Sequence, residues 1–144
     1  METKKTILLI EDDAVTAMVT SSILESFGYK VVHTNTGEKG VRIALENKSL
    51  LLVISDINLG SKMNGLEAAR QIREKRNIPI IFLTSHSDDE HRSLAHDISP
   101  HGYVVKHSQN SVLLSTIQRA LKQKDAYTKN AEPESLRQLT TQVD

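Results

Sequence analysis

Cysteine is missing from this chain of 144 residues. A disulfide framework, thiol catalysis and cysteine-ligated zinc are therefore excluded. The chain also lacks an excess of either charge, because 18 Lys and Arg residues balance 18 Asp and Glu residues. This balance gives no support to a nucleic acid or an anionic membrane as a partner.

Long hydrophobic runs are absent as well. No stretch approaches the roughly 20 apolar residues that span a bilayer, and the N-terminal "METKKT" leads into nothing like a signal peptide. We therefore expect a cytoplasmic protein. The length suits one domain with a sizeable core, which we expect over residues 4–124, followed by a polar tail or linker over 125–144.

Short apolar runs are the strongest structural signal. They lack the apolar–polar alternation of half-exposed strands, so they predict strands that are buried on both faces, as in parallel sheets. A fifth, weaker run does alternate. The predicted strands are residues 6–10, 29–34, 50–54, 78–83 and 103–105, of which 29–34 is the weak one.

Helical patterns alternate with these runs. The first carries Val15, Met18, Val19, Ile23 and Phe27 at helical spacing, and Thr36 and Asn64 are the expected N-caps of the second and third. The predicted helices are residues 14–27, 37–47, 65–75, 88–98 and 110–124. Strand–helix alternation repeated five times predicts an α/β fold, (βα)5, with a doubly wound five-stranded parallel sheet in the flavodoxin-like order 2-1-3-4-5.

Polar residues stand where the strong apolar runs end: Glu11, Asp12, Asp56, Thr84 and Lys106. In a doubly wound sheet these ends share one edge, and ligands bind there beside the switch point. Three converging carboxylates without a nearby His or Cys favour Mg²⁺. Each residue alone is a common cap, turn or surface residue, but together they predict a phosphoryl socket with Asp56 as nucleophile.

The sequence resembles a response-regulator receiver domain of bacterial two-component signalling over about residues 4–124. The segments "ILLIEDD", "VISDINLG", "NGLEAARQIR", "IPIIFLTSHSD" and "YVVKH" carry this resemblance. It implies that Asp56 is the phosphoacceptor and that Glu11 and Asp12 hold Mg²⁺, with the backbone carbonyl of Asn58 as a further ligand.

The resemblance also implies a switch. Thr84 matches the hydroxyl that moves toward the phosphoryl group, Tyr103 matches the aromatic residue that turns inward with it, and Lys106 matches the lysine that pairs with the phosphoryl group. His86 and Asn58 occupy positions that tune the lifetime of the phosphoryl group in this family. Asp13, one past the acidic pair, is expected to start a helix.

Three departures from the family pattern stand beside these matches. The predicted helix over 88–98 is weakly apolar, and "SPHGYV" replaces the usual Gly-Ala turn before the strand over 103–105. His107 replaces the usual proline after the lysine, so a trans peptide bond is expected there. The loop after the acceptor reads "NLGSKMNG", a form found in receivers of hybrid sensor kinases and their relatives.

The implied partner is a histidine kinase or a histidine phosphotransfer protein that presents phosphohistidine. The implied output surface is the face formed by residues 88–98, 103–105 and 110–124, which would contact a downstream protein or an attached domain, or form a homodimer. Such a protein assists its own aspartyl phosphorylation and dephosphorylation without being a conventional enzyme.

Two other functions are alternatives to this one. A phosphatase of the haloacid-dehalogenase kind needs a second Asp two residues after the first, where this chain has Asn58. A pseudo-receiver, which is a non-phosphorylated protein-binding module of the same fold, stays open chiefly because of His107.

Overall fold

The computed structural model describes residues 5–59, 63–85 and 101–131, with side chains described as far as residue 123. Three sequence-based expectations lie outside these ranges: the helix over 88–98, the placement of His86, and the end of the tail beyond residue 131.

All five strands are present and parallel, in the order β2-β1-β3-β4-β5, which confirms the predicted sheet. The strands are β1 Thr6–Ile10, β2 Lys30–Thr34, β3 Leu50–Asp56, β4 Ile80–Thr84 and β5 Gly102–Val105. Every residue of β1 and β4 is buried, as expected for apolar runs without alternation. The weaker run became β2, an edge strand with exposed residues at Lys30 and His33.

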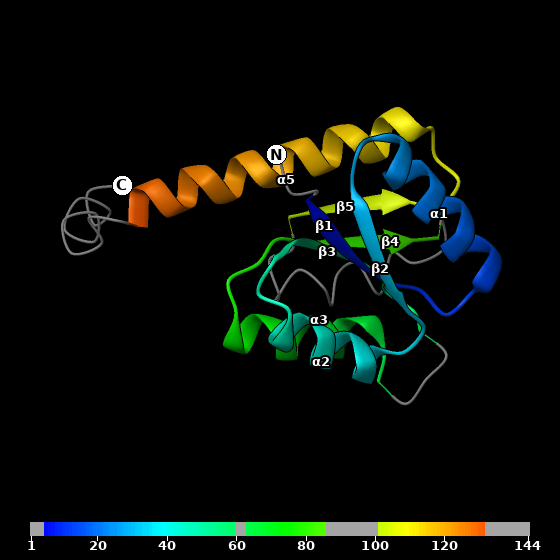
Figure 1. Cartoon of the computed structure of the whole chain (residues 1–144), viewed down its shortest axis with the longest axis horizontal. Coiled ribbons are helices and arrows are strands. Elements are labelled where there is room, and N and C mark those ends of the chain that lie inside the picture. Colours follow the sequence, from blue (N-terminus) through cyan, green and yellow to red (C-terminus); the bar gives the residue numbers. More distant parts are fainter. Residues whose placement is uncertain (1–4, 60–62, 86–100, 132–144) are drawn as a thin grey trace.

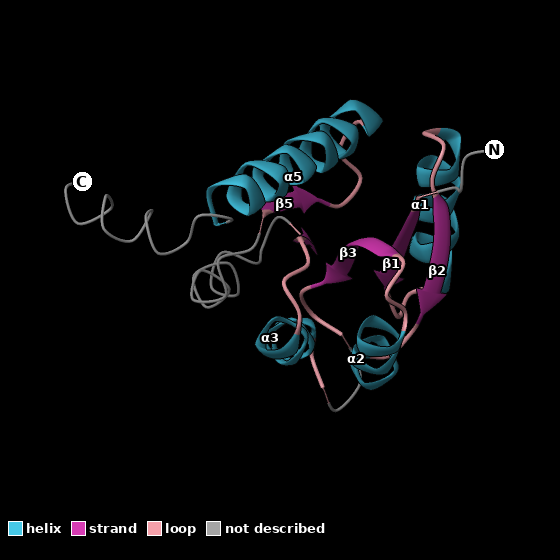
Figure 2. Cartoon of the chain, turned by 60° about the vertical axis from the view of Figure 1, so that its left-hand side comes forward, coloured by secondary structure: helices cyan, strands magenta, loops and turns pink. Residues whose placement is uncertain are grey.

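The described helices cover both faces of the sheet (Figure 1). They are α1 Ala14–Ser26, α2 Gly37–Glu46, α3 Gly65–Lys75 and α5 Asn110–Ala131. Figure 2 shows α1 and α5 on one side of the sheet and α2 and α3 on the other. Each side has its own buried apolar cluster, so the sheet is the middle of three layers.

Side-chain caps start the helices that follow the strands. Asp13 accepts a hydrogen bond from the Thr16 amide at 2.8 Å, and Asn64 accepts one from the Glu67 amide at 2.9 Å. Thr36 caps α2 in the same way. These caps confirm the expected helix starts, and the first two lie in the loops that carry the acidic residues.

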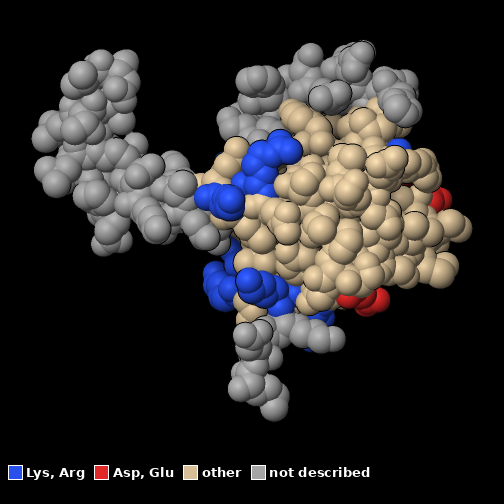
Figure 3. Space-filling view, turned by 90° about the horizontal axis from the view of Figure 1, so that it is seen from above, with Lys and Arg blue, Asp and Glu red and all other residues tan. Residues whose placement is uncertain are grey.

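The apolar spacing in α1 correctly indicated a helix but not the face that packs. The buried residues of α1 are Ala17, Thr20 and Leu24. Val15 and Met18 are each 64% exposed, and Val19 is 53% exposed. Figure 3 looks onto this side of the molecule, where Lys and Arg gather toward the end from which α5 leaves the domain and much of the remaining surface is uncharged.

Helix α5 continues to Ala131, seven residues past the predicted end at 124. The stretch after 124 is polar, which suggested a tail, but it contains no glycine or proline before Pro133 that would end a helix. In Figure 1 the last turns of α5 extend beyond the sheet. None of the helices in the described ranges combines the length and the hydropathy needed to cross a membrane.

Candidate functional site

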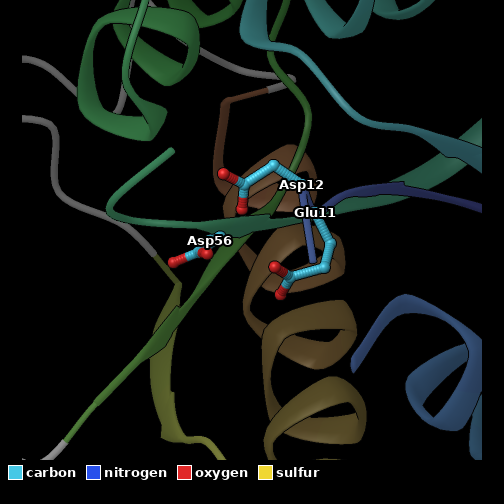
Figure 4. A group of neighbouring side chains, drawn as sticks. All are labelled: Glu11, Asp12 and Asp56. Carbon is cyan, nitrogen blue, oxygen red and sulfur yellow. The ribbon is translucent and has the colours of Figure 1, made fainter. Parts of the chain in front are cut away.

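Three carboxylates meet at the carboxyl ends of two neighbouring strands (Figure 4). Glu11 and Asp12 directly follow β1, and Asp56 is the last residue of β3, which pairs with β1. One carboxylate oxygen from each lies within 4.8 Å of the others. Glu11 is fully buried, Asp56 is 4% exposed, and Asp12 faces solvent. The predicted convergence of these side chains is therefore present.

Lys106, directly after β5, reaches two of these carboxylates. Its Nζ lies 2.8 Å from Asp56 Oδ2 and 3.3 Å from Glu11 Oε1. Burial alone would lower the pKa of Lys106, but the hydrogen bond and charge of Asp56, together with Glu11, raise it above its ordinary value. The ammonium group is therefore charged and contacts two acidic groups, Asp56 and Glu11.

The positive charge of Lys106 is not enough to keep the pKa of Glu11 at its ordinary value. Burial, aided by the charge of Asp56, raises the pKa of Glu11 from 4.5 to about 7, although the Asp13 amide and Lys106 oppose the rise. Glu11 Oε1 is buried and accepts no hydrogen bond from the part of the chain that the structure describes. A buried carboxylate oxygen beside two other oxygen donors fits a hard divalent cation such as Mg²⁺.

Two backbone features hold Asp56 in place. The Asn58 amide donates to Asp56 Oδ1 at 3.0 Å, so the two carboxylate oxygens have different partners. Gly65, at the start of α3, lies so close that a Cβ at this position would be 1.8 Å from the Asp56 carbonyl oxygen. Sequence reasoning missed this role of Gly65, because the close approach occurs between residues nine positions apart.

Thr84 and Tyr103 lie on the adjacent strands β4 and β5. Thr84 is fully buried at the end of β4, where its hydroxyl donates to the Ser85 carbonyl at 3.0 Å. Tyr103 is half-buried in β5, and its ring centroid lies 6.1 Å from that of Phe82. The Lys106 amide donates to the Thr84 carbonyl at 2.8 Å. A backbone hydrogen bond thus connects Thr84 to Lys106, the residue that contacts Asp56.

His107 adopts a left-handed backbone conformation, with φ of 68°. It occupies the third position of a turn closed by a hydrogen bond from the Ser108 amide to the Val105 carbonyl at 3.1 Å. No described peptide bond is cis, as expected without proline. This turn leaves Lys106 in contact with Asp56, so the His107 replacement does not displace the lysine.

An apolar groove runs beside the cluster between α1 and the start of α5. Val15, Val19, Ile23 and Leu113 are among its lining residues, and Lys106 borders it. The groove thus places exposed apolar side chains of α1 next to the lysine that contacts Asp56.

Comparison with known proteins agrees with this geometry. A family model described as the response regulator receiver domain matches residues 7–118. The aerobic respiration control protein ArcA of Escherichia coli strain K12 is 38% identical over 100 residues, which make up 69% of this chain and 41% of ArcA. The CAI-1 autoinducer sensor kinase/phosphatase CqsS of Vibrio cholerae is 31% identical over 118 residues, covering 79% of this chain and 17% of that protein.

A solved structure of a receiver domain has a similar fold. The signal receiver domain of a modulated diguanylate cyclase from Desulfovibrio desulfuricans G20 superposes with a TM-score of 0.80 and 31% sequence identity. The match covers 87% of this chain and 99% of that one.

Proposed function

Because this chain belongs to the response regulator receiver family of two-component signalling, we propose that Asp56 accepts a phosphoryl group in a Mg²⁺-dependent reaction. The donor is phosphohistidine on a histidine kinase or a histidine phosphotransfer protein. The observation that carries the proposal is the contact of 2.8 Å between Lys106 Nζ and Asp56 Oδ2, beside the buried carboxylate of Glu11.

The chemistry follows from the groups around Asp56. A carboxylate oxygen of Asp56 attacks phosphorus in line with the donor, so that a P–O bond forms as the P–N bond to the donor imidazole breaks. Lys106 offsets negative charge on the transferring oxygens from the side of β5. Glu11, Asp12 and Asp56, with the Asn58 carbonyl, would hold Mg²⁺, which when bound supplies further positive charge to the phosphoryl oxygens.

We propose that Thr84 and Tyr103 read the phosphorylation state. The Thr84 hydroxyl moves toward the phosphoryl group, and Tyr103 turns inward as Thr84 moves. The half-buried position of Tyr103 and the hydrogen bond between Lys106 and Thr84 support this assignment. The response is a shift between two states of the face that includes β5 and α5, which would contact a downstream protein or form a homodimer. His86 and Asn58 stay predicted tuning positions for the lifetime of the phosphoryl group.

The surface of α1 supports a protein as the phosphoryl donor. Val15, Met18 and Val19 are exposed on this helix, and Val15 and Val19 line the groove beside Lys106. Exposed apolar side chains next to a reactive group are typical of a docking surface.

The chain spans less than half the length of ArcA. We propose that residues 4–124 form the receiver unit and that 125–144 are a tail or linker, whose first part continues α5. The signal then passes either to an attached domain or to a separate protein in the cytoplasm.

The test is treatment of the metal-loaded protein with acetyl phosphate, followed by intact-mass measurement. We expect a mass gain of one phosphoryl group that requires Mg²⁺ and is lost in Asp56→Asn. Glu38→Gln, which removes an exposed carboxylate of α2, is the matched control and should retain the gain. No mass gain, and no Mg²⁺-dependent response to beryllofluoride, would instead favour the non-phosphorylated binding module.

A further inference from the structure

Two residues at the carboxyl end of β2 form hydrogen bonds with the backbone amide and carbonyl of Glu11. The Glu11 amide donates to the Thr34 carbonyl at 3.0 Å, and the Glu11 carbonyl lies 2.8 Å from His33 Nε2. Because a carbonyl oxygen can only accept, Nε2 of His33 carries the proton of this hydrogen bond. The His33 side chain therefore contacts the acidic cluster through the backbone and takes no part in the chemistry proposed above.

The carbonyl that His33 holds belongs to the peptide between Glu11 and Asp12. In an extended chain, neighbouring side chains point in opposite directions. Here Glu11 is buried and Asp12 is exposed, yet an oxygen from each lies within 4.8 Å of the other and of Asp56. The chain must therefore turn at their shared peptide, and the orientation of that peptide sets the angle between the two carboxylates.

His33 lies outside the hydrophobic core, so its hydrogen bond to Glu11 can be tested without disturbing core packing. His33 lies on the edge strand β2, and its side chain is exposed. It lines a surface hollow together with Asp12 and Lys39, on the outer side of the acidic cluster. Replacing the ring would open no cavity in either apolar cluster, so its contact with Glu11 is the feature that a substitution would remove.

We propose that His33 is a positioning residue for the metal site, whose Nε2–H fixes the Glu11–Asp12 peptide and keeps both carboxylates aimed at one ion. This proposal rests on the proposed function, since it takes Mg²⁺ as the ion bound there. Groups that orient metal ligands from outside the coordination sphere commonly change metal affinity by about 10- to 100-fold when they are removed.

The experiment measures the Mg²⁺ dissociation constant by isothermal titration calorimetry, at one pH above the ordinary range of histidine titration. His33→Leu removes the donor, whereas His33→Gln places an amide N–H near the position of Nε2. We expect His33→Leu to weaken Mg²⁺ binding about tenfold and His33→Gln to stay close to the wild type. In the metal-free protein, His33→Leu should also shift the NMR resonance of the Asp12 amide, which belongs to the same peptide.

Thr36→Ala is the structural control, because it removes the cap of α2 just beyond β2. It should lower thermal stability and leave Mg²⁺ affinity unchanged. If the wild type binds Mg²⁺ and both His33 variants bind it equally well, the role of His33 is overturned while the proposed function stands. If Mg²⁺ binding weakens equally in both His33 variants, the loss of the Nε2–H hydrogen bond is not the cause of the weakening. A wild type that binds no Mg²⁺ would overturn the proposed function and this inference together.

Discussion

Replacing Glu11 with glutamine should make the metal-free protein more stable at neutral and alkaline pH, although it damages the proposed site. Glu11 is fully buried, and one of its carboxylate oxygens accepts no hydrogen bond from the described residues. Its pKa rises from 4.5 to about 7, first because of burial and then because of the charge of Asp56. The ionised side chain is therefore a source of instability that Glu11→Gln removes.

The size and sign of the effect follow from this pKa. A rise from 4.5 to about 7 corresponds to about 3 kcal/mol of free energy. Between these two pH values the folded protein keeps the proton on Glu11, while the unfolded chain has lost it. The stabilising contribution of neutral Glu11 is thus complete below pH 4.5 and is lost as the pH rises through about 7.

The measurement is urea unfolding followed by far-ultraviolet circular dichroism, with a chelator present, at several pH values from about 5 to about 8. The free energy of unfolding of the wild type minus that of Glu11→Gln should fall by about 2–3 kcal/mol across this range. Glu74→Gln, which removes an exposed carboxylate of α3, serves as control and should parallel the wild type.

Added Mg²⁺ should reverse the order of stability at the alkaline end. A ligand at about 1,000 times its dissociation constant stabilises the folded state by about 4.1 kcal/mol, which exceeds the deficit of about 3 kcal/mol. The wild type should gain this, while Glu11→Gln gains much less. Parallel pH curves for the wild type and Glu11→Gln, without Mg²⁺, would refute the reasoning, because Glu11 would then be ionised at no cost.

Three further predictions concern the residues around the cluster. Lys106→Met should slow phosphorylation by acetyl phosphate about a hundredfold while Asp56 still reacts, as measured by the rate of mass gain. His107→Gly should raise the free energy of unfolding by about 1 kcal/mol, and His107→Pro should lower it, because proline cannot adopt φ of 68°; urea unfolding distinguishes the two. Gly65→Ala should lower that free energy by more than about 2 kcal/mol, because the added methyl would lie 1.8 Å from the Asp56 carbonyl oxygen. Gly40→Ala, whose added methyl would press on the fully buried side chain of Ile10 rather than on backbone, should also lower it, but by less.

The arrangement of the acidic cluster could be predicted because a parallel sheet allows few alternatives. Once the apolar runs are assigned to strands alternating with helices, their carboxyl ends must share an edge. Asp56 was identifiable because it ends the run "LLLVIS", and Lys106 because it follows "YVV". Their contact at 2.8 Å follows from this topology rather than from any local propensity.

The features that could not be predicted depend on where side chains point, rather than on where helices and strands lie along the sequence. Helical spacing identified α1, but it does not say which face packs, and the small residue Ala17 is buried while Met18 is exposed. The contact of His33 with Glu11 requires the register of β2 against β1 and the orientation of one ring. No sequence pattern encodes either of these for a histidine on an edge strand.

The charge balance of the site suggests how phosphorylation could reach the rest of the sheet. Lys106 divides one positive charge between Asp56 and Glu11, at 2.8 and 3.3 Å. A phosphoryl group on Asp56 would replace one negative charge by about two, and would draw the ammonium group away from Glu11. The amide of Lys106 is hydrogen-bonded to the Thr84 carbonyl. If the backbone of Lys106 shifts with its side chain, this hydrogen bond carries the shift to Thr84 at the end of β4. The proposed movements of Lys106 and Thr84 should therefore be coupled rather than independent.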